Sequence, residues 1–246
     1  EIGRGGHASV HFARDLAHGR DVAVKVIRSD LADPAQRRRF LQEIEFAARL
    51  RHPYIVPLLE SGEAGGVLYY VMPYVEGESL RDRLDREGPL PLPDVLALAG
   101  DLAEAIDFAH ANGVIHRDIK PQNVLLSGRH ALVADFGIAL ALEGEGGARI
   151  TAQGVTVGTP AYMSPEQAEA RPVIDGRSDI YSLGCVVYEM LTGEVPFPGE
   201  TPRAILAKHL QAPVPELAIL RPSIAPGVQR ALAQALAKLP AERYAS

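Results

Sequence analysis

The chain has 246 residues, which is long enough to bury a full core in one large domain or in two lobes. A net charge of −6 argues against a nucleic-acid-binding protein, because such a protein needs a basic surface to neutralise phosphates. A single cysteine excludes an internal disulfide framework, and no apolar run reaches the roughly 18 residues that a membrane-spanning helix needs.

The first predicted feature is a glycine-rich turn over residues 3–10, followed by a strand over residues 10–13. Glycine allows positive φ angles and a close approach of backbone N–H groups to phosphate oxygens. Taken alone, these residues are weak evidence, and a plain hairpin turn is the default interpretation. An alternating strand is predicted over residues 21–27, with Lys25 in its middle.

A helix is predicted around residues 39–50, and it holds two glutamates with different surroundings. At 100° per residue, Glu43 lies among apolar residues, whereas Glu45 lies on a face shared with arginine and histidine side chains. A carboxylate on an apolar face needs a partner, because burial of an unpaired charge is costly. A buried strand is predicted over residues 67–72, and it leads into residues 73–77.

Residues 93–111 are predicted to form a second long helix, with Asn112-Gly113 as its stop. This helix leads to the stretch His116-Arg117-Asp118-Ile119-Lys120-Pro121-Gln122-Asn123. A short hairpin is predicted over residues 124–134, because two apolar runs flank a turn formed by serine and glycine.

This hairpin predicts that Asn123 and Asp135 lie side by side at the open ends of two paired strands. An amide oxygen and a carboxylate at that separation suit Mg²⁺, a hard ion that shares its remaining ligands with phosphate and water. Alone, the His-Arg-Asp triplet is usually a solvated loop, and Asp135-Phe136-Gly137 is usually a turn. Together, in this order and spacing, the two motifs predict a phosphate-transfer site.

The chain is rich in glycine and threonine over residues 143–159 and shows little periodicity there. A loop of this length inside a compact domain is usually functional or disordered. Residues 196–246 are predicted to form helices punctuated by prolines, including one over residues 227–239, and they show no chemical motif.

The two motifs together resemble those of the protein kinase family, and most closely those of the bacterial eukaryotic-like serine/threonine kinases. The resemblance implies an α+β fold with two lobes. The small N-terminal lobe would hold an antiparallel β-sheet and one main helix, and the larger C-terminal lobe would be mostly helical. The implied boundaries are residues 1–72, a hinge at 73–78, and residues 79–246. We expect both lobes to be truncated, because the chain starts without Met inside a predicted strand and stops soon after a predicted helix.

The resemblance also implies an ATP site. Lys25 matches the lysine that holds the α- and β-phosphates and pairs with a helix glutamate, for which the apolar surroundings favour Glu43. Met72 matches the gatekeeper, after which the carbonyl of Pro73 and the N–H of Val75 would face the adenine. The other implied contacts are the loop glycines Gly3, Gly5 and Gly6, with Ala8 at the third glycine position, and the apolar walls Ile2, Val10, Ala23 and Leu125.

For catalysis, the resemblance implies that Asp118 orients the attacking hydroxyl and accepts its proton, and that Lys120 contacts the γ-phosphate. It assigns metal binding to Asn123 and Asp135, with Mg²⁺ as the ion and Mn²⁺ as an alternative. His116 is assigned a packed, hydrogen-bonded scaffold role. Lysine at position 120 is typical of serine/threonine kinases.

Residues 143–159 occupy the place of the family's activation loop, which implies regulation. Phosphorylated Thr151 or Thr156 would supply the anion that a buried Arg117 needs. Thr159 matches the substrate-site threonine, which is expected to bond Asp118 and Lys120.

Two further contacts are implied in the larger lobe. Glu166, which follows Ser164 and Pro165 in place of the family's usual alanine and proline, is expected to pair with Arg243 and brace the lobe. Asp179 is expected to support the backbone of the catalytic loop.

The predicted function is that of a serine/threonine protein kinase, which transfers the γ-phosphate of MgATP to protein hydroxyls and activates itself by autophosphorylation in trans. The expected partners are protein substrates and a second copy of the chain, which is compatible with a homodimer, and no nucleic acid. The domain is expected to work in the cytoplasm, and any membrane anchor of the parent protein would lie outside this chain. Two alternatives are a pseudokinase, which commonly lacks one of Lys25, Asp118 and Asp135, and a small-molecule phosphotransferase, which generally lacks the pattern of residues 117–120.

Overall fold

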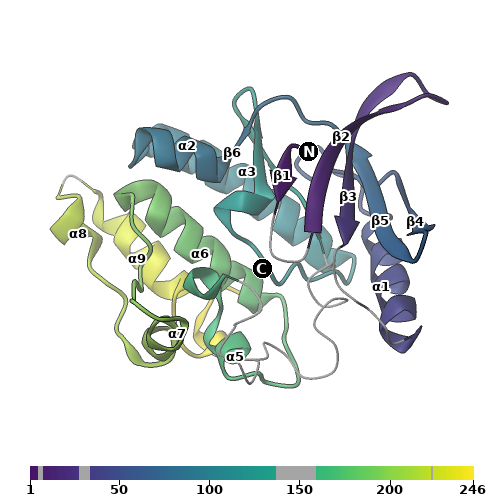
Figure 1. Ribbon diagram of the computed structural model, residues 1–246. Helices are drawn as coiled ribbons and strands as arrows, with labels where there is room; N and C mark the ends of the chain where they lie inside the picture. The colour runs from purple at the N-terminus through teal and green to yellow at the C-terminus, as the bar shows by residue number, and fades with distance from the viewer. Residues whose placement is uncertain (5–7, 28–33, 137–158, 223) are drawn as a thin grey trace.

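The computed structural model describes residues 1–4, 8–27, 34–136, 159–222 and 224–246, except for the side chains of residues 34–36, 39 and 43. The strands at the N-terminal end gather on one side of the molecule, and most of the helices gather on the other (Figure 1). This arrangement confirms the predicted α+β fold with two lobes. In the described part of the chain, no helix is both long enough and apolar enough to cross a membrane.

The smaller lobe is an antiparallel sheet with one helix, α1, beside it (Figure 1). Within the described residues the strand order is β1-β2-β3-β5-β4. Its core combines residues from the sheet with the buried Phe40 and Ile44 of α1. The elements are β1 (Gly3–Arg4), β2 (Ala8–Asp15), β3 (Arg20–Ile27), α1 (Pro34–Ala47), β4 (Glu60–Ala64) and β5 (Val67–Pro73).

The larger lobe is mostly helical and has the main hydrophobic core of the molecule. Two long helices, α3 and α6, pack against each other, and α3 also contacts β8. The α-helices are α2 (Leu80–Glu87), α3 (Leu92–Ala111), α5 (Pro165–Ala168), α6 (Arg177–Thr192), α7 (Pro202–Gln211), α8 (Leu217–Leu220) and α9 (Pro226–Ala235). The 3-10 helices are η1 (Pro121–Asn123), η2 (Pro160–Tyr162) and η3 (Pro240–Glu242).

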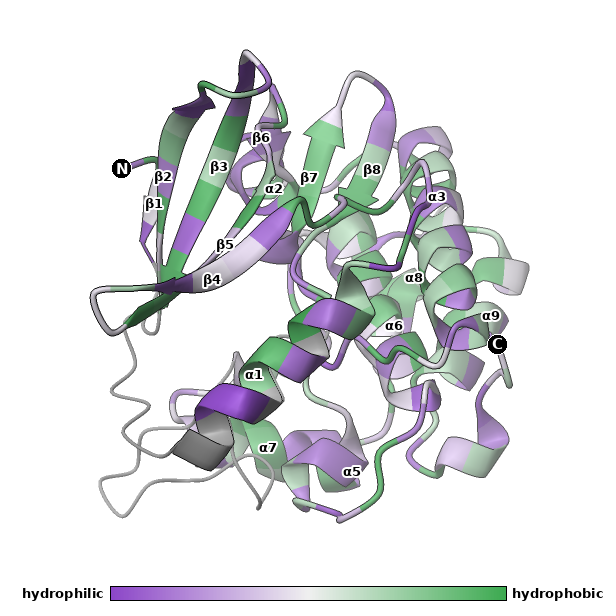
Figure 2. Ribbon diagram, turned by 90° about the vertical axis from the view of Figure 1, so that its right-hand side faces the viewer, coloured by the Kyte–Doolittle hydropathy of each residue, from purple (hydrophilic) through white to green (hydrophobic). Residues whose placement is uncertain are grey.

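A second, small sheet lies where the lobes meet, with β7 between β6 and β8 (Figure 2). Most of β7 is hydrophobic (Figure 2), and its first residue Val124 is fully buried. The N–H of Val133 donates to the carbonyl of Tyr54 at 2.8 Å, and its carbonyl accepts the N–H of Val56 at 2.9 Å. These two bonds attach the small sheet to the chain that comes from the smaller lobe. The strands are β6 (Glu78–Ser79), β7 (Val124–Ser127) and β8 (His130–Val133).

The helix predicted over residues 227–239 differs from the one observed, because α9 ends at Ala235. Leu239 adopts an extended conformation, with φ −84° and ψ 126°. Pro240 follows it, and a residue before proline is disfavoured in the helical region because the proline ring clashes with its backbone. This accounts for the extended conformation of Leu239, while the helix itself ends at Ala235.

Candidate active site

The predicted hairpin is confirmed, and it sets the positions of the polar residues at its open end. Val124 pairs with Val133 across β7 and β8, and the N–H of Ala134 donates to the carbonyl of Asn123 at 2.9 Å. Asn123 comes directly before β7, and Asp135 comes shortly after β8. Because the two strands are antiparallel, both residues lie at the same end of the hairpin. The sequence placed these two residues side by side for the same reason.

Asp118, Lys120 and Asn123 form a connected group of side chains. The Nζ of Lys120 donates to Oδ2 of Asp118 at 2.6 Å. The Nδ2 of Asn123 donates to the same oxygen at 3.0 Å and to the carbonyl of Asp118 at 2.8 Å. Because the amide nitrogen of Asn123 makes both of these bonds, its amide oxygen stays available for another ligand.

A buried carboxylate holds the backbone that carries this group. Asp179, in the first turn of α6, has no exposed surface and accepts the backbone N–H groups of His116 and Arg117 at 2.8 and 2.7 Å. The Nε2 of His110, at the end of α3, donates to the same carboxylate at 2.8 Å. The predicted support by Asp179 is thus seen, and His110 adds a contact that the sequence analysis missed.

His116 has the scaffold role that the sequence predicted. Its Nδ1 accepts the N–H of Asp118 at 3.2 Å, so its Nε2 carries the hydrogen that reaches the carbonyl of Ala134 at 2.9 Å. Its ring meets that of Phe136 edge-on, with centroids 4.6 Å apart. The imidazole therefore joins the catalytic loop to the chain around Asp135.

An ion pair joins the smaller lobe to this group. The Nζ of Lys25, on β3, donates to Oδ2 of Asp135 at 2.5 Å, although the two residues are 110 positions apart in the sequence. The hydroxyl of Tyr70, on β5, donates to the other carboxylate oxygen. Burial favours a neutral Asp135, but the charge and hydrogen bond of Lys25 and the hydrogen bond of Tyr70 outweigh it, so the pKa of Asp135 is lowered.

Three of the residues predicted to hold adenine, Ala23, Met72 and Pro73, lie on β3 and at the end of β5. In the register of the sheet Ala23 is opposite Met72, and Pro73 is opposite Val22. Ala23 is buried, and Ile2 at the chain start is half exposed. In the described part of the chain, the N–H of Val75 makes no backbone hydrogen bond.

The family model for the protein kinase domain matches residues 1–245. The chain belongs to the protein kinase domain family. It is 45% identical over 250 residues to the serine/threonine-protein kinase PknB of Mycobacterium tuberculosis (strain ATCC 25177 / H37Ra), and 44% identical to PknB of Mycobacterium leprae (strain TN). Each alignment covers 99% of this chain and 40% of the relative, so the chain spans well under half of these proteins.

A solved kinase domain has the same fold. The crystal structure of a point mutant of the Mycobacterium tuberculosis PknI kinase domain matches with a TM-score of 0.77 and 33% sequence identity. The match covers 100% of this chain and 88% of that one. Protein kinases as a family use ATP and divalent metal ions.

The kinase residues at the proposed metal position fit such an ion. Mg²⁺ prefers oxygen ligands and is usually bound by one or two carboxylates together with phosphate oxygens. Asp135 supplies a carboxylate whose lowered pKa keeps it charged, and Asn123 supplies an amide oxygen that accepts no hydrogen bond from the described residues. The donor set thus agrees with the predicted role of both residues.

Several predicted kinase residues lie outside the described part of the structure. They are Gly5 and Gly6 of the glycine-rich loop, Thr151 and Thr156 of the activation segment, and the side chain of Glu43. Thr159 is described, and its carbonyl accepts the N–H of Tyr162 at 3.3 Å. Among the described residues its hydroxyl makes no hydrogen bond to Asp118 or Lys120, so that expected contact is not seen.

Arg117 has a constrained backbone and an unsatisfied side chain. Its φ of +68° lies in the left-handed region, and its carbonyl accepts the Nε2 of Gln167 at 2.8 Å. Its Nε is buried and has no hydrogen-bond partner among the described residues. A buried guanidinium nitrogen without a partner is costly, so this position favours an acceptor.

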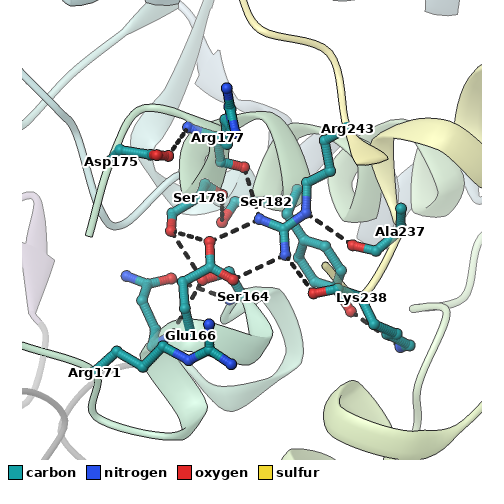
Figure 3. Close-up of polar contacts among 12 residues, drawn as sticks. Ser164, Glu166, Arg171, Asp175, Arg177, Ser178, Ser182, Ala237, Lys238 and Arg243 are labelled. Atoms are coloured by element: carbon teal, nitrogen blue, oxygen red, sulfur yellow. Dashed lines mark hydrogen bonds and ion pairs between the residues drawn. The ribbon is translucent and has the colours of Figure 1, made fainter. Parts of the chain in front are cut away.

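The predicted pair of Glu166 and Arg243 is confirmed and is almost completely buried. The guanidinium of Arg243 donates to both carboxylate oxygens, at 2.7 and 2.8 Å (Figure 3). It also reaches the carbonyls of Ala237, Lys238 and Arg177. Ser178 donates its hydroxyl to Glu166 as well.

Tyr70 is the main site residue that the sequence analysis missed, although the chain holds a clue to it. Residues alternate between the two faces of a strand, so Tyr70 shares the core face of β5 with Leu68 and Met72. A tyrosine hydroxyl on a core face needs a hydrogen-bond partner. The sequence did not say which one, because Asp135 is 65 positions away.

Proposed function

We propose that this domain transfers the γ-phosphoryl group of MgATP to serine and threonine hydroxyls of proteins. The observation that carries the proposal is the convergence of two lobes on one group of side chains. Lys25 reaches Asp135 at 2.5 Å from the smaller lobe, and Lys120 and Asn123 surround the Asp118 carboxylate in the larger one. These are the residue types that phosphoryl transfer requires, because its catalysis is mainly positioning and charge stabilisation.

Asp118 is proposed to orient the acceptor hydroxyl and to accept its proton. The hydroxyl oxygen then forms a bond to the γ-phosphorus, and the bond from that phosphorus to the β–γ bridging oxygen breaks, which releases ADP. Lys120, 2.6 Å from Asp118, is placed to donate to the γ-phosphate oxygens. Lys25 is proposed to hold the α- and β-phosphates.

Asn123 and Asp135 are proposed to hold Mg²⁺, for which Mn²⁺ could substitute. When bound, the ion would neutralise the negative charge that the phosphates bring to the site. The lowered pKa of Asp135 supports this role, because it keeps the carboxylate in the form that binds a cation.

Residues 73–78 are proposed to be the hinge between an N-lobe of residues 1–72 and a C-lobe of residues 79–246. The N–H of Val75, which makes no backbone hydrogen bond among the described residues, and the carbonyl of Pro73 would then meet the adenine edge, beside Met72. The glycine-rich loop, with Gly3, Gly5 and Gly6, is proposed to cover the phosphates. Ile2, Val10, Ala23 and Leu125 are proposed as the apolar walls, and Glu43 as the partner of Lys25.

A transfer assay with labelled ATP and a generic acceptor protein tests this function. We expect label on serine and threonine, identified by phosphoamino-acid analysis, and none on tyrosine. A chain that binds ATP and transfers nothing would be a pseudokinase, and transfer only to small molecules would identify a small-molecule phosphotransferase. Phosphotyrosine as the main product would also contradict the proposal.

Activation is proposed to occur by phosphorylation of Thr151 or Thr156 by a second copy of the domain, in a transient homodimer. The buried, unsatisfied Nε of Arg117 supports this, because a phosphate would give it an acceptor. Thr159 is proposed to serve at the substrate site.

When active wild-type protein is mixed with an Asp118→Asn chain, mass spectrometry should find phosphate on the inactive chain. A fully active wild type with neither threonine modified would contradict this mechanism.

The domain is proposed to act in the cytoplasm, where ATP is available. The alignment covers 40% of the PknB proteins that this chain resembles. The substrates and partners of the whole protein are therefore proposed as well, because the similarity does not extend over the whole length of those relatives.

A further inference from the structure

Tyr70 lies in the core of the smaller lobe and yet reaches the candidate metal ligand. Its side chain is 2% exposed and packs in the cluster that includes Phe40 and Ile44 of α1. On the sheet it is directly opposite Lys25. The Nζ of Lys25 lies 5.8 Å from the centre of the tyrosine ring, and both side chains donate to Asp135.

Asp135 needs such contacts because its backbone is strained. Its φ of +68° lies in the left-handed region, which a non-glycine residue keeps only when its surroundings hold it there. In the described part of the chain, the side chains that donate to its carboxylate are Lys25 and Tyr70, one on each oxygen. Two residues of the smaller lobe therefore contact this carboxylate, while the hairpin of β7 and β8 positions the backbone that carries it.

The two donors differ in what they can do once a nucleotide binds. Lys25 is the residue that the phosphates would engage, so its bond to Asp135 has to be shared or given up. The side chain of Tyr70 is buried, so the phosphates would not replace its hydrogen bond to Asp135. The hydroxyl of Tyr70 is buried and donates to Asp135 from within the core of the smaller lobe.

A hydrogen bond from this hydroxyl is compatible with metal binding. A carboxylate has about four lone-pair positions on its two oxygens, so one donated bond leaves room for a cation. Groups that hydrogen-bond to metal ligands in this way fix the orientation of the ligand, and their loss typically weakens metal binding about 10- to 100-fold.

We propose that Tyr70 is a positioning residue that orients the Asp135 carboxylate for the divalent ion through its buried hydroxyl. The role rests on the proposed function of Asp135 as a metal ligand. It assigns to Tyr70 a task beyond filling the core, and it makes the metal site depend on β5 as well as on the hairpin of β7 and β8.

The test is the Tyr70→Phe variant, which removes the hydroxyl and keeps the ring. Calorimetry measures the affinity of a non-hydrolysable ATP analogue, first in EDTA and then over a Mg²⁺ series. We expect the metal-free affinity to change less than about twofold, and the Mg²⁺ concentration for half-maximal enhancement of binding to rise about 10- to 100-fold. Tyr70→Leu should raise the Mg²⁺ requirement likewise, and thermal melting checks that both variants fold.

Tyr69→Phe is the matched control. Tyr69 is the neighbour of Tyr70 on β5, it faces the other side of the sheet, and its hydroxyl lies 3.4 Å from Glu60. We expect its Mg²⁺ requirement to equal that of the wild type.

Three results would overturn the role of Tyr70. One is an unchanged or lower Mg²⁺ requirement in Tyr70→Phe, because a lower one would mean that the hydroxyl competes with the ion. Another is an equal loss of metal-free and metal-bound affinity, because that indicates packing alone. A wild type whose ATP binding does not respond to Mg²⁺ would overturn the proposed function itself, so the two failures are distinguishable.

Discussion

Arg243 and Glu166 form an ion pair whose side chains are 0% and 5% exposed. Both carboxylate oxygens accept from the guanidinium, and Ser178 donates a further bond. Two charges in the interior are tolerated only with such complete pairing, and removal of one partner leaves the other buried without compensation. The pair therefore makes the larger lobe sensitive to a single substitution far from the catalytic loop.

Glu166→Gln is expected to destabilise the domain by about 3–5 kcal/mol, because Arg243 would keep its buried charge and lose its counter-charge. Urea unfolding measures the change. Glu169→Gln is the control, since Glu169 pairs with Arg171 at 2.6 Å on the surface with both side chains nearly half exposed. Equal stability losses in the two variants would contradict the account.

The stability of the same pair should depend on pH. Burial acts to raise the pKa of Glu166, but the hydrogen bonds from Arg243 and Ser178 and the charge of Arg243 lower it below the ordinary value of 4.5. A carboxyl with a lowered pKa in the folded state stabilises above its unfolded pKa, and this contribution is lost as the pH falls through the folded value. The stability difference between wild type and Glu166→Gln should thus shrink below about pH 4.5. A difference that stays constant down to pH 3 would disprove the linkage.

At the scale of elements, the passage from β5 to β6 is fixed by one glycine. Gly77 has φ +143°, and a Cβ built there would lie 2.1 Å from the carbonyl oxygen of Leu126 on β7. An added Cβ would therefore clash with the backbone of β7, at the point where the predicted hinge joins the small sheet. The clash cannot be relieved by a change of side-chain conformation, because the atom that it meets belongs to the backbone.

Gly77→Ala is expected to destabilise the domain by clearly more than Gly128→Ala and to weaken ATP binding. Gly128, in the turn between β7 and β8, also has positive φ, at +60°, but a Cβ there would meet nothing within 4 Å. Alanine at position 128 should cost only the strain of its backbone, about 1–2 kcal/mol. Urea unfolding and nucleotide titration of both variants give the comparison, and a Gly77→Ala variant no weaker than Gly128→Ala would contradict the geometry.

Local chemistry explains which elements the sequence could predict. The hairpin of β7 and β8 was predictable because its two apolar runs and the serine-glycine turn between them are adjacent in the chain. The helix α3 was predictable from its length and its asparagine-glycine stop, within one residue. The end of α9 was missed because the helical pattern continues to Leu239, although Pro240 disfavours a helical conformation at that residue and the helix already ends at Ala235.

At the scale of the whole molecule, contacts between distant segments were predictable only where a resemblance supplied them. The pairs formed by Glu166 with Arg243 and by Asp179 with the catalytic loop are of this kind. Lys25 meets Asp135, which no local pattern indicates, and Tyr70 reaches Asp135 across 65 positions. Such contacts depend on how β5 and the hairpin of β7 and β8 are placed relative to each other. The hydrophobic periodicity of the sequence carries no information about that placement.

We propose that residues from both lobes hold the nucleotide, while Asp118 orients the acceptor hydroxyl and accepts its proton. The most direct test measures MgATP affinity by calorimetry and kcat with a protein substrate, on wild type and on Asp118→Asn. The account predicts an affinity within about threefold of wild type and a kcat lower by about 10²- to 10⁴-fold, the range that a positioned general base contributes. A kcat for Asp118→Asn close to that of the wild type would contradict it.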